Sequence, residues 1–75
     1  MSEMKRLTAL IHREGDWYVS FCPELNVTSQ GETIEMARDN LREAVELTLE
    51  CADEKEIEAR LIGELYITPL EVAVG

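Results

Sequence analysis

The sequence predicts a small α+β domain in which one main helix covers one face of a mixed four-stranded β-sheet. Three observations predict this class: residues 6–13 and 17–21 alternate in polarity as strands do, residues 34–52 repeat at the helical period, and residues 70–74 alternate again. The element order is therefore β-β-β-α-β. A right-handed crossover through the helix places the last strand parallel to the first, in sheet order 3-2-1-4. One face of this sheet then has no helix of its own.

The first two strands are expected to form a hairpin. Gly15 lies between them and can adopt the positive φ of a tight turn. Trp17 and Phe21 share one face of the second strand and Tyr18 lies on the other, so the two neighbouring aromatic residues split between the faces. Pro23 ends this strand, because proline cannot donate to a β-ladder.

A third strand and the main helix follow. Residues 27–30 form the short strand, and Gly31 ends it. Thr33 is placed to cap the helix, since its hydroxyl can accept an orphan N–H of the first turn. The helix is expected to bury an apolar stripe and to expose acids on its other side. The stripe consists of Ile34, Ala37, Leu41, Ala44, Val45, Thr48, Leu49 and Ala52, and the acids are Glu35, Asp39, Glu43, Glu46 and Glu50.

The spacing of Arg42 and Glu46 predicts an i,i+4 ion pair on the helix surface. Met36 and Leu47 lie off the stripe and are either ordinary exposed residues or part of a subunit contact. Residues 53–64 are charged and form either a frayed second helix or a loop. After Pro69, the last strand is expected to run from Leu70 to Val74.

Composition narrows the range of partners. The 75 residues include 7 Lys and Arg against 16 Asp and Glu, for a net charge of −9. A negative surface argues against capture of nucleic acid or anionic lipid and favours a basic partner. We expect one domain over residues 1–75 with a marginal core, for which oligomerisation is a common remedy. No signal sequence or membrane span is expected, and Cys22 and Cys51 are expected to be reduced packing residues of a cytoplasmic protein.

No catalytic, cofactor or metal site is expected, so the chain is interpreted as a non-enzymatic protein. A two-metal nuclease site needs clustered carboxylates, but the first strand has none and only Glu71 lies inside the last strand. His12 is the only histidine and lies at a strand end, where it is interpreted as a surface residue. Neither cysteine is linked to His12 by a known catalytic signature.

A family pattern runs from Gly15 to Ala44. An aromatic strand leads into the Pro-Glu-Leu loop at residues 23–25, and a short strand then ends in Gly-Glu-Thr-Ile-Glu at residues 31–35. Ala37 follows, and Asn-Leu-Arg-Glu-Ala at residues 40–44 continues the helix. In this order and spacing the chain resembles the HicB-like antitoxin family, over about two thirds of its length.

The resemblance implies a partial ribonuclease-H-like fold without nuclease carboxylates, assembled into homodimers or homotetramers. It also implies neutralisation of a small basic HicA-like toxin that cleaves mRNA. Three departures accompany it. Met36 replaces the family's glutamate and removes half of a capping box, and Asn26 follows Leu25 where the family usually has Pro-Gly. No helix-turn-helix or ribbon-helix-helix segment precedes Gly75, so operator binding by this chain alone is not expected.

Two functions are open at this stage. In the first, the chain is an antitoxin-type binding module that masks a basic RNase by steric cover and charge complementarity. In the second, it is a self-associating structural or adaptor module with no toxin partner, whose bare sheet face is buried between identical subunits. For the first function the expected contact residues are Tyr18, Glu24, Leu25, Glu46 and Glu50.

Overall fold

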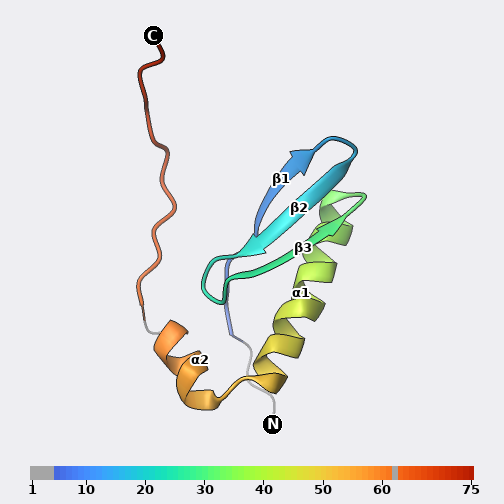
Figure 1. Ribbon diagram of the computed structural model, residues 1–75, viewed down its shortest axis with the longest axis vertical. Coiled ribbons are helices and arrows are strands. Elements are labelled where there is room, and N and C mark those ends of the chain that lie inside the picture. Colours follow the sequence, from blue (N-terminus) through green and yellow to red (C-terminus); the bar gives the residue numbers. More distant parts are fainter. Residues whose placement is uncertain (1–4, 62) are drawn as a thin grey trace.

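The computed structural model describes residues 5–61 and 63–75, so residues 1–4 and Ile62 of the predicted domain lie outside the described residues. The elements are β1 (Leu10–Glu14), β2 (Trp17–Cys22), β3 (Val27–Gly31), α1 (Ile34–Cys51) and α2 (Glu54–Leu61). The three strands form one antiparallel sheet in the order β1-β2-β3, and α1 lies along one face of it (Figure 1). The α+β class is therefore confirmed.

The predicted hairpin is formed by β1 and β2. Glu14 lies opposite Trp17, so only Gly15 and Asp16 turn the chain, and Gly15 has a φ of 62°. A positive φ at the first of two turn residues is typical of a type II′ turn, which favours glycine because glycine has no Cβ. This turn matches the twist of the two strands and fixes their register.

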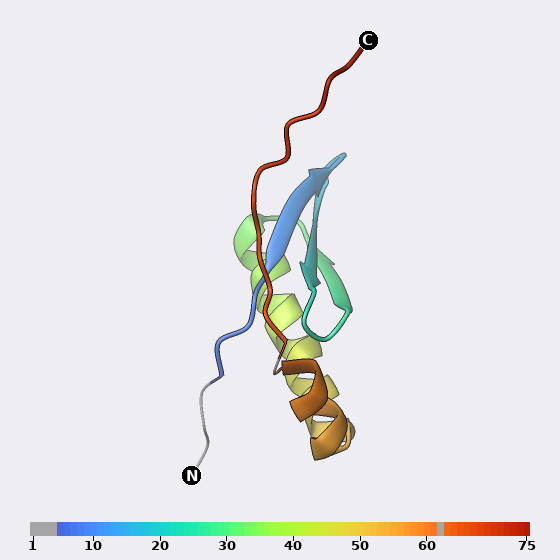
Figure 2. The ribbon, with the colours of Figure 1, turned by 90° about the vertical axis from the view of Figure 1, so that its left-hand side faces the viewer.

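The sheet has one covered face and one open face. The Ser20 hydroxyl donates to the Ala37 carbonyl of α1 (2.8 Å), which places Ser20 and Tyr18 on the helix side. Trp17 therefore lies on the other side, and the predicted split of the two aromatic residues is confirmed. Figure 2 shows α1 on one side of the sheet only. We call the other side the open face; it consists of Leu10, His12, Glu14, Trp17, Val19, Phe21, Thr28 and Gln30.

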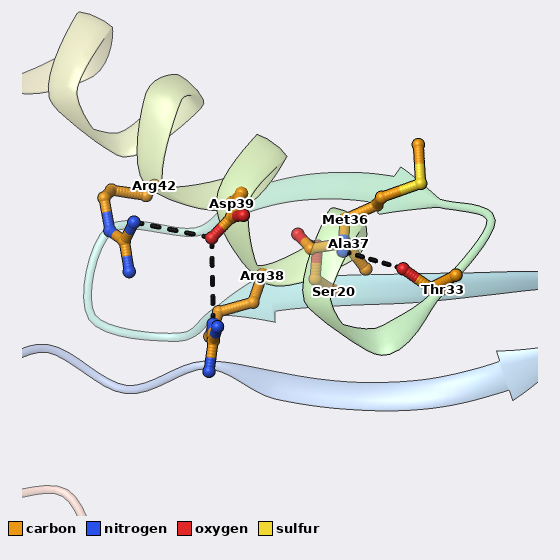
Figure 3. A network of polar contacts seen from close by, with 7 residues as sticks. All are labelled: Ser20, Thr33, Met36, Ala37, Arg38, Asp39 and Arg42. Atoms are coloured by element: carbon orange, nitrogen blue, oxygen red, sulfur yellow. Dashed lines mark hydrogen bonds and ion pairs between the residues drawn. The ribbon is translucent and has the colours of Figure 1, made fainter.

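The start of α1 is held by the cap that the sequence predicts. The Thr33 hydroxyl accepts the Met36 N–H at 3.1 Å (Figure 3), and the Thr33 carbonyl accepts the Ala37 N–H at 2.9 Å. Gly31, the last residue of β3, lies directly against this first turn. A Cβ added to Gly31 would lie 2.5 Å from the Ala37 nitrogen, so only glycine lets helix and strand approach this closely.

The core lies between the sheet and α1. Cys22, Leu25 and Leu41 are each at most 3% exposed, and Ala37 is fully buried. The centre of the predicted helix stripe is therefore confirmed, but its first residue, Ile34, is 51% exposed because it precedes the part of α1 that faces the core. Burial of a side chain the size of Leu41 stabilises a fold by about 1.5–3 kcal/mol.

The ion pairs of α1 differ from the prediction. Arg42 and Arg38 both approach the Asp39 carboxylate, at 3.4 and 3.8 Å (Figure 3). The predicted pair between Arg42 and Glu46 is therefore wrong, because Asp39 lies one turn earlier on the same surface and receives the guanidinium instead. These pairs are exposed to solvent and contribute little to stability.

The charged stretch after α1 forms the helix α2 rather than a loop. The Asp53 carboxylate accepts the Lys55 N–H (3.0 Å) at its start, and Ile57 is buried. Arg60 reaches back across the chain and donates to the Leu25 carbonyl at 3.0 Å. This bond ties α2 to the loop between β2 and β3.

The two cysteines have different environments, although both are free thiols. Cys22 is buried, so its predicted packing role is confirmed. Cys51 is exposed, and its predicted packing role is wrong because it ends α1 beyond the core. Neither of the helices in residues 5–61 and 63–75 is long and apolar enough to cross a membrane.

The predicted fourth strand is not formed within this chain. Residues 64–75 contain no helix or strand and are all exposed, and they form an extended segment that leaves the end of α2 and does not join the sheet (Figure 1). We call these residues the C-terminal arm. Alternating polarity makes residues 70–74 suitable for a strand, but a strand also needs a neighbour to supply its hydrogen bonds. The sheet described here is therefore three-stranded, and the predicted order 3-2-1-4 lacks its last member.

Candidate protein-binding surfaces

The open face presents large apolar side chains to solvent. The two-residue period of β2 places Trp17, Val19 and Phe21 on this side, and Leu10 of β1 lies opposite Phe21. Trp17 is 45% exposed and Leu10 is 40% exposed, while Val19 and Phe21 are half-buried. Clustered apolar side chains with a large aromatic residue are typical of surfaces that bind other proteins.

A polar edge borders this apolar surface. His12 Nε2 lies 3.5 Å from Glu14 Oε2, and the two side chains are 66% and 71% exposed. The contact is an ion pair only when His12 is protonated. His12 is therefore a surface residue on the open face, as predicted, and its described partner is a carboxylate.

Glu24, a predicted contact residue, joins two parts of the chain. Its carboxylate accepts the Thr8 backbone N–H (3.1 Å) and the Thr8 hydroxyl (2.8 Å), and it lies 3.5 Å from the Cys22 thiol. Burial opposes ionisation of Glu24, but these hydrogen bonds outweigh it and lower its pKa. Because the Thr8 N–H is used here, β1 begins at Leu10 rather than at the predicted residue 6.

Leu25 and Tyr18 are less accessible than a contact role requires. Leu25 is 3% exposed and packs with Leu41 in the core, so its side chain is not part of the surface. Tyr18 is half-buried on the helix side, opposite Gly31. The sequence pattern could not separate these roles, because an apolar residue in a loop can face either the core or a partner.

Glu46 and Glu50 are exposed on the outer side of α1, one turn apart. They belong to a row of exposed acids on this helix. Both arginines of α1 pair with Asp39, which lies in the first half of the helix. The second half of α1 therefore presents a local excess of negative charge. We call this row the acidic ridge; it consists of Glu35, Glu43, Glu46 and Glu50.

The predicted contact residues do not form one patch. Glu24 and Leu25 lie in the loop near the second half of α1, since Leu25 shares a small hollow with Thr48 and Ala52. Tyr18 lies at the other end of the sheet, against the glycine that precedes α1. The sequence interpretation identified the acids of the ridge but did not assign Trp17, the most exposed residue of β2, to a contact surface.

Neither a search for metal ligands nor a comparison with known proteins assigns a site or a family to this chain. Within the described ranges 5–61 and 63–75, no three His, Cys, Asp or Glu side chains are grouped so that they could hold a metal ion. Comparisons with protein-family models, with curated proteins and with solved structures return no match for this chain.

Proposed function

We propose that this protein is an antitoxin-type binding module that masks a small, basic, mRNA-cleaving toxin of the HicA-like class. The observation that carries the proposal is the acidic ridge on α1, where Glu43, Glu46 and Glu50 are exposed while both arginines of the helix pair with Asp39. Such a row of like charges attracts a basic surface of matching length. The resemblance of residues 15–44 to HicB-like antitoxins supports the same choice of partner.

The proposed mechanism combines attraction and steric cover. Opposite charges speed the encounter and orient the partners, although they add affinity less reliably. Apolar contact through Met36 and Leu47, which are exposed on α1 beside the ridge, would supply the buried area that stable complexes need. A toxin whose basic surface is covered in this way cannot reach the phosphate backbone of mRNA.

The proposal includes the fold, assembly and location that the resemblance implies. In this proposal, β1, β2, β3 and α1 would be the first four elements of a partial ribonuclease-H-like arrangement, and residues 70–74 would be its fourth strand. The protein would act as a cytoplasmic homodimer or homotetramer, without enzymatic activity, and would not bind nucleic acid directly because its net charge is −9.

Co-expression tests the proposal. Where a small basic protein is encoded next to this chain, its gene is expressed from an inducible promoter, with and without this chain. We expect growth arrest by the toxin alone, rescue on co-expression, and co-elution of the two proteins. Growth that stays arrested, with no complex eluting, would refute the proposed function.

The acidic ridge can be tested with matched charge changes. Glu46→Gln/Glu50→Gln removes two charges from the ridge, and Glu54→Gln/Glu58→Gln removes two charges at the same spacing on exposed positions of α2. We expect the ridge variant to associate about three- to tenfold more slowly with the toxin at low salt, and the α2 variant to stay within about twofold of the unmodified protein. Equal effects of the two variants would show that only net charge matters and that the ridge is not the contact.

A second candidate function is favoured by a different observation. The open face and the C-terminal arm leave apolar residues exposed, and a self-associating structural or adaptor module would bury them between identical subunits. The absence of any neighbouring gene for a small basic protein would favour this module over the antitoxin.

A further inference from the structure

The C-terminal arm carries an uncommon amount of exposed apolar surface. Six of its residues have large hydrophobic side chains that are between 45% and 91% exposed: Leu65, Tyr66, Ile67, Leu70, Val72 and Val74. A protein rarely leaves so many apolar residues of one segment in contact with water. This segment therefore needs a surface to cover it, which its position in the described structure does not provide.

The end of the arm has the pattern of a strand. Leu70, Val72 and Val74 alternate with Glu71 and Ala73, so an extended backbone places the first three in one row. Pro69 has no N–H, which limits the pairing segment to the residues after it. The pairing segment, residues 70–74, has the length of β1.

The two edges of the sheet are not equally available to such a strand. At β3, the Gln30 carbonyl accepts a hydrogen bond from the Asn40 side chain of α1 at 2.8 Å, so this edge is partly capped by the helix. At β1 the sheet order ends, and no strand of the described residues lies beyond it. β1 is therefore the edge that can accept a further strand.

Strand alternation identifies which groups of β1 are available. The Gln30 carbonyl points away from β2, so the opposite pair Val19 and Gln30 is not hydrogen-bonded across β2 and β3. Val19 therefore directs its backbone groups to His12 of β1. By the same alternation, Ile11 and Arg13 direct their N–H and C=O groups to the free side of β1.

Charge adds a second argument for this pairing. Residues 5–13 contain Lys5, Arg6, His12 and Arg13 and no carboxylate, in a chain whose net charge is −9. The arm contains Glu64 and Glu71 and no basic residue. The basic stretch, which covers β1 up to Arg13 and leaves out only Glu14, is thus complementary to the acidic arm, although two copies of this chain repel each other overall.

We propose that residues 70–74 of one copy add as a strand to the free edge of β1 in a second copy, and that the exchange is reciprocal. Each copy has one arm and one free β1 edge, so two copies satisfy both and close the assembly. In the proposed pairing, the row Leu70, Val72 and Val74 lies on the α1 side of the sheet, beside the half-buried Ile11. Glu71 then remains on the open face, in solvent.

Light scattering on the full chain tests the assembly without any toxin. We expect the mass of a dimer at micromolar concentration. Val72→Asp should raise the dimer dissociation constant by at least about tenfold, because it places a carboxylate in the apolar row that packs beside Ile11. Ala73→Asp adds the same charge at the next residue, in the opposite row, and should change the constant by less than about threefold. A monomer, or equal effects of the two variants, would overturn the proposal.

Mixed labelling establishes which chain supplies the strand. Protein labelled only at isoleucine methyl groups is unfolded, mixed with protein labelled only at leucine and valine methyl groups, and refolded together. Nuclear Overhauser effects between Ile11 methyls and Val72 or Val74 methyls then arise only between different chains. Their presence is the expected result. A dimer that lacks these Overhauser effects would overturn the strand exchange. So would a dimer that shows them only in uniformly labelled protein, because the contacts would then lie within one chain. Neither outcome bears on toxin binding, which its own experiment tests.

Discussion

Substitution of Gly31 by alanine should destabilise the protein more than the same substitution at any other glycine of the chain. The new Cβ would lie 2.5 Å from the Ala37 nitrogen and 2.7 Å from the Met36 carbonyl carbon, well inside the distances that real Cβ atoms show. Both neighbours are backbone atoms in the first turn of α1, so no flexible side chain can move aside. The helix must shift away from β3 or the strand must bend.

The cost follows from the contacts that such a shift disturbs. Overpacking by a methyl group costs about 1–3 kcal/mol. The Thr33 cap and the Ser20–Ala37 hydrogen bond lie at the same place and contribute about 1 kcal/mol each. Because these terms share one displacement and do not add fully, we expect a loss of about 2–4 kcal/mol. In a domain of this size, that loss lowers Tm by roughly 10–30 °C.

Thermal and urea unfolding followed by far-ultraviolet circular dichroism measure this loss. Gly63→Ala is the matched control, because nothing lies within 4 Å of its added Cβ and its backbone does not have a positive φ. All variants are compared at one protein concentration, so that association affects them equally. A Gly31→Ala protein that melts within about 2 °C of the unmodified protein would refute the close approach of β3 and α1.

Two further predictions concern titratable groups. Since the folded pKa of Glu24 is lowered from its ordinary value of 4.5, its contribution to stability is present above that value and is lost as the pH falls through the lower folded pKa. Glu24→Gln should therefore reduce stability at neutral pH and flatten its fall below pH 4.5, as measured by urea unfolding at several pH values; an unchanged acid profile would contradict this. Burial raises the pKa of the Cys22 thiol, while Cys51 is exposed, so a thiol reagent should modify Cys51 at least about tenfold faster, by mass spectrometry of the digested protein. Comparable rates at both cysteines would contradict the buried position of Cys22.

The features that local rules govern could be predicted from the sequence. The hairpin follows from two alternating stretches around Gly15, and the start of α1 follows from Thr33, because turn and cap each depend on a few adjacent residues. The open face follows equally, since a single main helix covers only one side of a sheet.

The features that depend on distant contacts could not be predicted. Leu25 was expected on a contact surface but packs against Leu41, and this outcome depends on how the loop folds over α1. Arg42 had two acids within reach, and the sequence alone does not decide between Glu46 and Asp39. The stretch 70–74 has the pattern of a strand. Whether it pairs also depends on which sheet edge is available, and on whether that edge belongs to the same chain or to another.

The most direct test of the proposed function is a titration of RNA cleavage. A small basic protein that the co-expression experiment identifies as the toxin is purified and incubated with mRNA while this protein is added in increasing amounts. We expect RNA cleavage to stop once the binding sites on this protein equal the toxin molecules in number. Inhibition should weaken as the salt concentration rises, because the acidic ridge contributes to the encounter. Cleavage that continues undiminished in excess protein would contradict the account.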